Sequence, residues 1–465
     1  MTRTAPQKFH FIGICGTAMG SVAAALRERG FKVSGSDENV YPPMSIFLEE
    51  RGIKLHRGYA KENLPSDADV VVIGNAMKRG NPEIEAVLNR KLFYLSLPEV
   101  LRNYFLRGKH NLVVTGTHGK TTTTSLLTWI MEKAGRNPGY LIGGIPKNLV
   151  QGARLNDSKY FVIEGDEYDS AFFDKRSKFV HYLPELVIVN NIEFDHADIF
   201  NNLDEVKLSF SRLLRIVPQN GMVVLNGDDH NCVEVAKDCF AQMVEVGFSK
   251  NCAQRIRDAA YSPDGSRFKL GEDVYEIPLV GEFNVRNAAM AATAARFYDV
   301  PKAKIDNALK TFTGVARRQE IRGEARGVKV IDDFGHHPTA IAQTLDGLRH
   351  RFHGQRIWAI FEPRSNTTRR AVFQRELPEA LKQADGVFIS EVARLEQIPE
   401  DERLHPEQVV KEISKDGRPA FYERNADAIV DRIVPLVKKK DVIVVFSNGG
   451  FDNIHEKLLR RLRNR

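Results

Sequence analysis

Short apolar runs recur along the chain, and each one leads into a turn that carries glycine, asparagine or a carboxylate. The clearest runs are Phe9–Ile14, Val70–Met77, Asn111–Val114, Tyr160–Glu164 and Leu186–Asn191. A stretch with helical character follows most of them. Continuous apolar runs of this length are typical of strands buried on both faces, as in parallel sheets covered by helices. The pattern therefore predicts an α/β fold built on mainly parallel sheets.

The runs fall into three blocks of the 465-residue chain. Domains usually span about 100–200 residues, so this length suggests about three of them. We expect an N-terminal Rossmann-like domain over residues 1–108, a central domain with a phosphate-binding parallel sheet over 109–321, and a C-terminal Rossmann-like domain over 322–465. The segment 239–273 is less regular and favours short strands with a turn at 261–266.

A Gly-Lys-Thr turn stands between the run Asn111–Val114 and a helical stretch. Strand, turn and helix in this order are the context of a phosphate-binding loop, because glycines let backbone N–H groups at the helix start approach the anion. We expect Lys120 to reach the β- and γ-phosphates and Thr121 to offer its hydroxyl to Mg²⁺. A chance Gly-Lys-Thr is the alternative, since two residues separate the glycines where the common loop has four. The residues expected to cradle the nucleotide are Gly116, Thr117, His118, Gly119, Lys120, Thr121 and Thr122.

A second glycine turn, from Gly13 to Gly20, follows the first apolar run and precedes a helix. Its spacing differs from the dinucleotide fingerprint G-x-G-x-x-G, so a generic NAD site fits poorly. Asp37 lies about 20 residues further on, where an acidic side chain usually holds a ribose hydroxyl; a simple turn residue is the alternative. Asn75 lies near the end of the run Val70–Met77, which places it on the ligand side of the predicted sheet.

Carboxylates gather after the run Tyr160–Glu164, where four of them stand within six residues. A solvated acidic loop is the simplest interpretation, but a cation site next to the phosphate loop explains the clustering better. We expect Glu164 to be the best-placed ligand because it ends the strand. The pair Asp195-His196 follows the next run, and it suits either a second metal position or proton handling.

Two asparagines, Asn284 and Asn287, open an alanine-rich helical stretch. A side-chain amide at such a place can recognise the edge of adenine through its paired donor and acceptor. The alternative is an asparagine that caps the helix start.

Composition is that of an ordinary soluble protein, with 67 basic and 60 acidic residues and a net charge of +7. This excess suits small anionic substrates, and it is too small and too dispersed to indicate nucleic acid. The four cysteines form no C-x-x-C pair, which favours reduced thiols. The first six residues lack an apolar signal segment, and no run reaches the length of a membrane span, so we expect a cytoplasmic protein without a membrane partner.

Taken in sequence order, these motifs resemble those of the ATP-dependent muramyl ligases of bacterial cell-wall synthesis, over nearly the whole chain. The shared motifs are the short loop 116–121, the Glu164 turn, the Asp195-His196 pair, the Asn284/Asn287 helix start, Arg318 and the stretch 332–338. The Thr-His-Gly-Lys loop and the Gly-His-His-Pro turn resemble the branch that acts on UDP-N-acetylmuramate. The stretches 13–17, 39–45, 171–182 and 362–367 resemble members that use the recycled tripeptide L-alanyl-γ-D-glutamyl-meso-diaminopimelate.

The resemblance implies roles around the nucleotide. Lys120 would hold the γ-phosphate, and the magnesium ligands would be Thr121, Glu164 and His196. The remaining nucleotide contacts would be Asn287 to adenine, Arg318 to phosphate and Asp332 to the ribose. Phe283 departs from the family's adenine motif, Gly-x-His-Asn, because it replaces the histidine.

The resemblance also implies roles around the other substrates. The UDP part would be held by Gly13, Gly16, Thr17, Asp37 and Asn75. His118 would lie near the muramoyl group, with His337 and Arg364 near the incoming peptide. The expected catalytic residues are Lys120, His196, Arg318 and His337, with His337 or His196 as a candidate base for the amine.

The implied activity is an ATP- and Mg²⁺-dependent amide ligation of UDP-N-acetylmuramate to the tripeptide, or to a peptide of another length, through an acylphosphate, in peptidoglycan recycling. The alternative in the same branch is the ligase that adds single L-alanine. A nucleotide-sugar-binding regulator without catalysis conflicts with the joint presence of Lys120, Glu164 and His196, and a nucleic-acid-binding ATPase lacks its basic stripe. Because the substrates must be enclosed, we expect the C-terminal domain to close over the central one.

Overall fold

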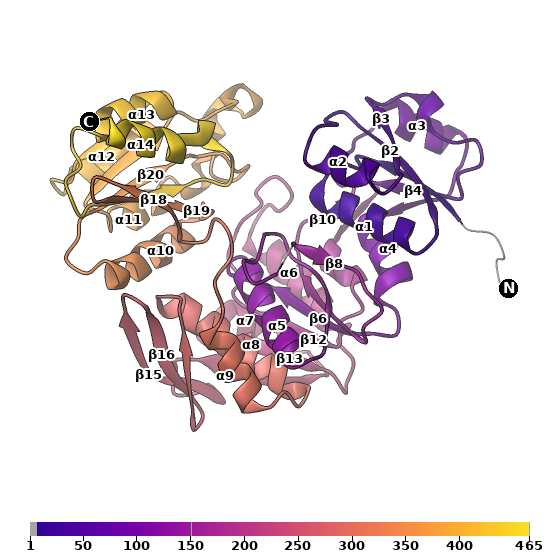
Figure 1. Cartoon of the computed structure of the whole chain (residues 1–465), viewed down its shortest axis with the longest axis horizontal. Helices are drawn as coiled ribbons and strands as arrows, with labels where there is room; N and C mark the ends of the chain where they lie inside the picture. Colours follow the sequence, from indigo (N-terminus) through magenta and orange to yellow (C-terminus); the bar gives the residue numbers. More distant parts are fainter. Residues whose placement is uncertain (1–6, 150, 465) are drawn as a thin grey trace.

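The computed structural model describes residues 7–149 and 151–464. The chain forms three lobes, which follow one another from indigo through magenta to yellow in Figure 1, and each is built on its own sheet. Residues 1–6, on which the expectation about a signal segment partly rests, lie outside the described residues. In the part of the chain that is described, no helix combines the length and the apolar character that crossing a membrane requires.

The N-terminal lobe has a five-stranded parallel sheet in the order β3-β2-β1-β4-β5. Its strands are β1 Lys8–Ile12, β2 Lys32–Asp37, β3 Lys54–Arg57, β4 Val70–Ile73 and β5 Tyr94–Ser96, and its helices are α1 Thr17–Glu28, α2 Met44–Glu49, α3 Pro82–Asn89 and α4 Leu97–Leu101. The strand expected over 70–77 ends at Ile73, because Gly74 begins a turn closed by the bond from Met77 N to Gly74 O. Asn75 therefore lies in a loop beyond the strand.

The central lobe contains a ten-stranded sheet in the order β17-β16-β15-β14-β13-β12-β6-β9-β7-β8. Its strands are β6 His110–Thr115, β7 Gly139–Leu141, β8 Ala153–Arg154, β9 Tyr160–Glu164, β12 Leu186–Val189, β13 Met222–Asn226, β14 Gln242–Gly247, β15 Gln254–Ser262, β16 Gly265–Leu270 and β17 Asp273–Ile277. A separate hairpin joins β10 Asp169–Ala171 to β11 Asp174–Ser177, and the helices are α5 Lys120–Lys133, α6 Leu203–Leu214, α7 His230–Val235, α8 Glu282–Phe297 and α9 Lys302–Lys310.

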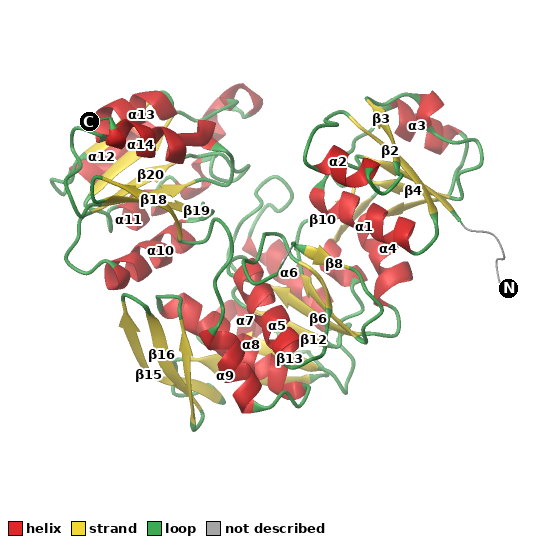
Figure 2. Cartoon of the chain, viewed as in Figure 1, coloured by secondary structure: helices red, strands yellow, loops and turns green. Residues whose placement is uncertain are grey.

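The strands at the centre of this sheet are parallel, whereas β15, β16 and β17 form an antiparallel extension. The extension reaches beneath the C-terminal lobe in Figure 2. The turn expected at 261–266 is the hairpin between β15 and β16, but β15 is nine residues long instead of short. Its residues alternate between buried and exposed only weakly, and a long strand of this kind has no clear period in the sequence.

The C-terminal lobe has a six-stranded sheet in the order β18-β19-β23-β20-β21-β22, parallel except for β18. Its strands are β18 Glu320–Ala325, β19 Val328–Asp333, β20 Ile357–Phe361, β21 Gly386–Ser390, β22 Ala420–Glu423 and β23 Val442–Phe446, and its helices are α10 Pro338–Arg351, α11 Glu376–Leu381, α12 Pro406–Ser414, α13 Ala426–Ile433 and α14 Ile454–Arg463. The predicted three-lobed α/β fold with parallel sheets is confirmed. The domain boundaries at 108 and 321 stay predictions.

Candidate active site

A cavity of about 1180 Å³ lies where the three lobes meet. The N-terminal lobe lines it with Gly16, Thr17 and Asn75, and the C-terminal lobe lines it with residues around His337. From the central lobe and the segment that follows it come the remaining predicted site residues at this cavity: Thr117, His118, Gly119, Lys120, Thr121, Thr122, Glu164, His196, Asn287 and Arg318. The fold thus brings together residues that stand up to about 320 positions apart, as ligand sites at the ends of parallel strands do.

The predicted phosphate loop joins β6 to α5. Gly116 and Gly119 have φ values of 132° and 78°, a region that residues with a Cβ rarely adopt. A Cβ on Gly116 would lie 2.9 Å from Cβ of Asn190, and one on Gly119 would lie 2.9 Å from Oδ1 of Asn287. Helix α5 begins at Lys120 itself, so the loop presents free N–H groups of the first helical turn to the cavity. This backbone fits the phosphates of a nucleotide.

Lys120 is held over the loop by a buried carboxylate. Its Nζ donates to Gly116 O at 2.7 Å and to Oε2 of Glu167 at 2.8 Å. Burial opposes the charge, but Glu167 and its acidic neighbours raise the pKa of Lys120 above its usual value. The other oxygen of Glu167 lies 3.2 Å from Nε2 of His196. Burial lowers the pKa of His196, yet the contact with Glu167 outweighs it and raises that pKa to about 9.

Thr121 and Glu164 form the most suitable oxygen pair for a divalent cation. The hydroxyl of Thr121 donates to Oε1 of Glu164 at 3.0 Å, and Gly143 N donates to the other carboxylate oxygen at 2.7 Å. Hydroxyl and carboxylate oxygens are the donors that Mg²⁺ prefers, so this pair fits the ion. The contact with Glu167 favours the protonated form of His196, and this form would have to lose its proton before the imidazole bound a metal.

Each carboxylate of the acidic turn has its own partner. Asp166 accepts from Lys178 at 2.6 Å, and Asp169 accepts from Lys175 at 2.5 Å. Glu167 serves Lys120 and His196, as described above. The simple interpretation of a solvated acidic loop is therefore wrong, because Glu167 is only 2% exposed and its charge is neutralised within the site. Asp166, Glu167 and His196 are also close enough together to share one cation.

Asn284 and Asn287 lie inside helix α8, whose first residue is Glu282 and whose capping position is Gly281. The expectation that an asparagine caps this helix is therefore wrong. Asn287 is buried and its amide lies against Gly119 of the phosphate loop, while the amide of Asn284 donates to Val280 O. Phe283 lines the cavity beside them. An adenine contact by Asn287 stays a prediction, and this position at the loop supports it.

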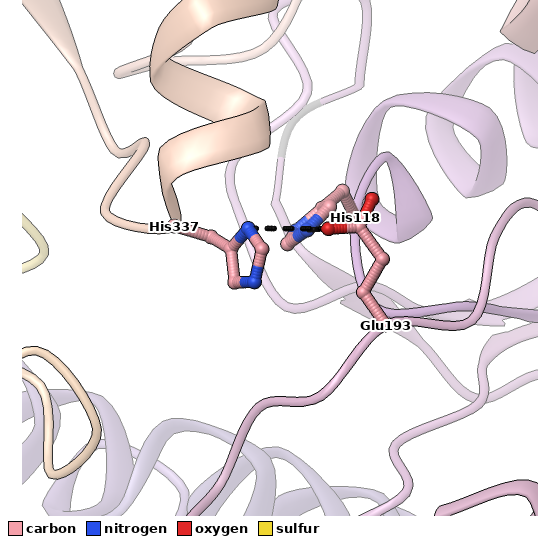
Figure 3. Close-up of side chains that lie close together, drawn as sticks. All are labelled: His118, Glu193 and His337. Atoms are coloured by element: carbon pink, nitrogen blue, oxygen red, sulfur yellow. Dashed lines mark ion pairs between the residues drawn. The ribbon is translucent and has the colours of Figure 1, made fainter. Parts of the chain in front are cut away.

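His118 and His337 lie next to each other, and both approach the carboxylate of Glu193, which comes from the loop after β12 (Figure 3). Oε2 of Glu193 lies 3.7 Å from Nε2 of His118 and 3.5 Å from Nδ1 of His337. The two imidazole rings have their centroids 4.3 Å apart. His118 therefore faces the C-terminal lobe, and its expected place near a muramoyl group stays a prediction.

Five predicted site residues are not among those that line the cavity: Gly13, Asp37, Gly116, Asp332 and Arg364. Asp37 accepts from the backbone of Cys15 in the glycine turn, so it shapes that turn from behind. Asp332 is 2% exposed and accepts from Arg317, whereas its neighbour Asp333 lines the cavity. Arg364 packs over Gly449 and lies near Glu362. Their expected ligand contacts stay predictions.

Two carboxylates at the site were not singled out by the sequence. Glu167 was one of four in an acidic turn, and Glu193 had no motif of its own. Their importance comes from partners that lie far away in the sequence, Lys120 for Glu167 and Thr339 for Glu193. The sequence offered one signal for Glu167 and Glu193: each follows a buried strand that lies next to the strand before the phosphate loop.

Models of one protein family match the chain in three consecutive segments. Residues 8–108 match the "Mur ligase family, catalytic domain", residues 114–295 the "Mur ligase middle domain" and residues 317–449 the "Mur ligase, glutamate ligase domain". Together these segments cover most of the chain.

Named relatives and a solved structure are similar over almost the full length. The UDP-N-acetylmuramate–L-alanyl-γ-D-glutamyl-meso-2,6-diaminoheptandioate ligase of Escherichia coli K12 is 45% identical over 97% of each chain. The UDP-N-acetylmuramate–L-alanine ligase of Acetivibrio thermocellus is 32% identical over 98% of this chain and 97% of that protein. The crystal structure of a murein peptide ligase from Psychrobacter arcticus superposes with a TM-score of 0.71 at 36% identity, over 99% of both chains.

Proposed function

The chain belongs to the Mur ligase family, and from this premise we propose that it joins UDP-N-acetylmuramate to the tripeptide L-alanyl-γ-D-glutamyl-meso-diaminopimelate at the expense of ATP. The reaction forms an amide bond, and it serves the recycling of peptidoglycan. One observation carries the proposal. A phosphate loop, a glycine turn of the N-terminal lobe and the His337 region of the C-terminal lobe meet in one cavity.

A carboxylate does not condense with an amine unaided, because oxide is a very poor leaving group. In the proposed reaction the γ-phosphoryl group of ATP passes to a carboxylate oxygen of the muramoyl group, and ADP is released. The amine of the peptide then attacks the carbonyl carbon, a C–N bond forms, and the C–O bond to phosphate breaks. Lys120 and Arg318 would stabilise negative charge on the transferring phosphoryl oxygens.

Thr121 and Glu164 supply the oxygen pair that supports a magnesium requirement, and His196 is a third candidate ligand. When bound there, Mg²⁺ neutralises charge on the phosphates. The amine must arrive without its proton. Both nitrogens of His337 already take part in hydrogen bonds, so a role as base would require those bonds to break.

The relative that uses the tripeptide is more similar to this chain than the relative that uses L-alanine, which favours the tripeptide as the amine substrate. The test offers purified protein UDP-N-acetylmuramate and ATP with either the tripeptide or L-alanine, and follows the amide by mass spectrometry. We expect amide with the tripeptide and far less with L-alanine. Preference for L-alanine would assign the chain to the alternative, and no ADP release with either amine would overturn the ligase proposal.

A further inference from the structure

Glu193 connects two lobes: its backbone bonds to the phosphate loop of the central lobe, and its carboxylate contacts the C-terminal lobe. Its backbone is fastened to the phosphate loop, because Glu193 N donates to Oγ1 of Thr117 at 2.8 Å and that hydroxyl donates back to Glu193 O at 3.2 Å. Its carboxylate points to the start of helix α10 in the C-terminal lobe (Figure 3). A shift of the phosphate loop would therefore also move Glu193, whose carboxylate contacts the C-terminal lobe.

The contact with α10 is a strong one. The hydroxyl of Thr339 donates to Oε2 of Glu193 at 2.6 Å, within the first turn of the helix. A carboxylate at a helix N-terminus is stabilised by the unpaired N–H groups there and by the helix dipole. Burial alone would raise the pKa of Glu193, but His118 and the hydroxyl of Thr339 hold it below its usual value, so the carboxylate is charged at neutral pH.

His337 positions this helix start and is not a free ligand. Its Nδ1 accepts from Thr339 N at 3.2 Å, so the imidazole caps α10. Its Nε2 then carries the proton and donates to Phe194 O in the central lobe at 3.3 Å. Because neither nitrogen offers a lone pair to an ion, a metal shared by His118, Glu193 and His337 is disfavoured, although the three groups are close enough for one.

Helix α10 contacts the central lobe at its far end as well as at its start. Near its far end, Gly347 approaches the start of α8 so closely that a Cβ there would lie 3.0 Å from Val280 O. The ring of His350 lies 4.7 Å from that of Tyr261 on the β15–β16 hairpin. The helix therefore contacts the central lobe at both ends, so its position on the central lobe sets the position of the C-terminal lobe.

We propose that Glu193 is a positioning residue that couples the phosphate loop to the seating of helix α10, so that the C-terminal lobe engages the peptide only over a correctly arranged loop. The inference rests on the proposed ligase function. When the coupling fails, the acylphosphate forms but the amine is badly placed. Water then attacks the carbonyl carbon, which returns UDP-N-acetylmuramate and releases phosphate. The signature is ADP released without a matching amount of amide.

The test compares Glu193→Gln and Thr339→Val with a matched control, Lys147→Ala. Lys147 also bonds across the lobes, to Glu320 at 2.8 Å, but its side chain is 39% exposed and is not among those that line the cavity. For Glu193→Gln we expect an unchanged affinity for a non-hydrolysable ATP analogue, a KM for the tripeptide raised about fivefold or more, and at least two ADP per amide. Thr339→Val should also raise the KM for the tripeptide and the number of ADP per amide. The double variant should have the same KM and ADP-to-amide ratio as Glu193→Gln alone. Lys147→Ala should match the wild type.

Wild-type ADP-to-amide ratios in Glu193→Gln and Thr339→Val, or a loss confined to ATP-analogue affinity, would overturn the coupling. If the wild type makes no amide from the tripeptide, the proposed function fails, and the coupling is then judged by small-angle scattering. It predicts that the ATP analogue contracts the wild type and Lys147→Ala but not Glu193→Gln or Thr339→Val. Equal contraction in all four proteins would refute it. Thermal unfolding of each variant shows whether it is still folded. If Glu193→Gln is unfolded, the ADP-to-amide ratio of Thr339→Val tests the coupling in its place.

Discussion

The ammonium of Lys120 and the imidazole of His196 share the two oxygens of one carboxylate, that of Glu167, at 2.8 and 3.2 Å. A lysine of a phosphate loop must be charged and correctly placed before the nucleotide arrives, and Glu167 achieves both. The same carboxylate holds His196 beside the loop. In this way one side chain from the acidic turn after β9 orders two of the groups to which we assign the chemistry.

Replacing Lys120 by Ala should lower kcat of amide formation by about 100- to 1000-fold, which corresponds to the ~2.7–4 kcal/mol typical of one lost electrostatic donor. The reason is that charge on the transferring phosphoryl group loses its nearest cation. Steady-state ADP release measures the effect. Lys415→Ala is the matched control, since this lysine is 62% exposed, pairs with Glu412 and is not among the residues that line the cavity. A Lys120→Ala variant as active as Lys415→Ala would remove Lys120 from the mechanism.

Glu164→Gln should raise the magnesium concentration needed for half-maximal activity by about tenfold or more, because a neutral amide oxygen binds a divalent cation less well than a carboxylate. Treatment with a chelator should abolish the activity of the wild type, and added Mg²⁺ should restore it. The measurement is a magnesium titration of ADP release at saturating substrates. Overlapping titration curves for the variant and the wild type would mean that the ion is held elsewhere.

His337 should make the stability of the fold depend on pH. Burial, together with the nearby His118, lowers the pKa of His337 from 6.5 to about 3, and Glu193 and Asp195 offset this only in part. Between these two values the unfolded chain binds more protons than the folded one, so stability is fully present above about pH 6.5 and is lost as the pH falls. His337→Asn keeps a capping side chain and removes the titration.

The wild type should therefore lose stability faster than His337→Asn below about pH 6.5, by at most ~1.4 kcal/mol per pH unit. Denaturant unfolding at a series of pH values measures this difference. Tryptophan fluorescence is a suitable probe because Trp129 lies in α5 of the central lobe and Trp358 in β20 of the C-terminal lobe. Parallel stability curves for the two proteins would show that His337 titrates normally.

The fold and the phosphate loop were predictable because their signals are local. The strands β4 and β12, which lie in two of the predicted runs, are buried at every position, so the composition of these runs identified them as strands. The loop 116–121 is likewise contiguous, and its glycines have the positive φ values that the motif requires. The helices α5 and α8 begin at Lys120 and Glu282, so polar motif residues occupy the first helical turn in both, where free N–H groups can face a ligand.

The pairings across the cavity were not predictable, because they depend on tertiary structure. Nothing in the sequence near Glu193 indicates that Thr339 will donate to it. Asp332 and Asp333 are adjacent in β19, and side chains alternate between the faces of a strand, so only one of them can point to the site. It is Asp333 that lines the cavity, while Asp332 turns to Arg317 and His455.

In the proposed reaction the sugar carboxylate is activated by phosphorylation before the amine attacks. The most direct test uses UDP-N-acetylmuramate labelled with ¹⁸O in the muramoyl carboxylate, together with ATP and the tripeptide, and examines the released phosphate by mass spectrometry. If an acylphosphate forms, the oxygen that bridges carbon and phosphorus leaves with the phosphate, so each phosphate carries one labelled atom. Amide formation with unlabelled phosphate would contradict the account.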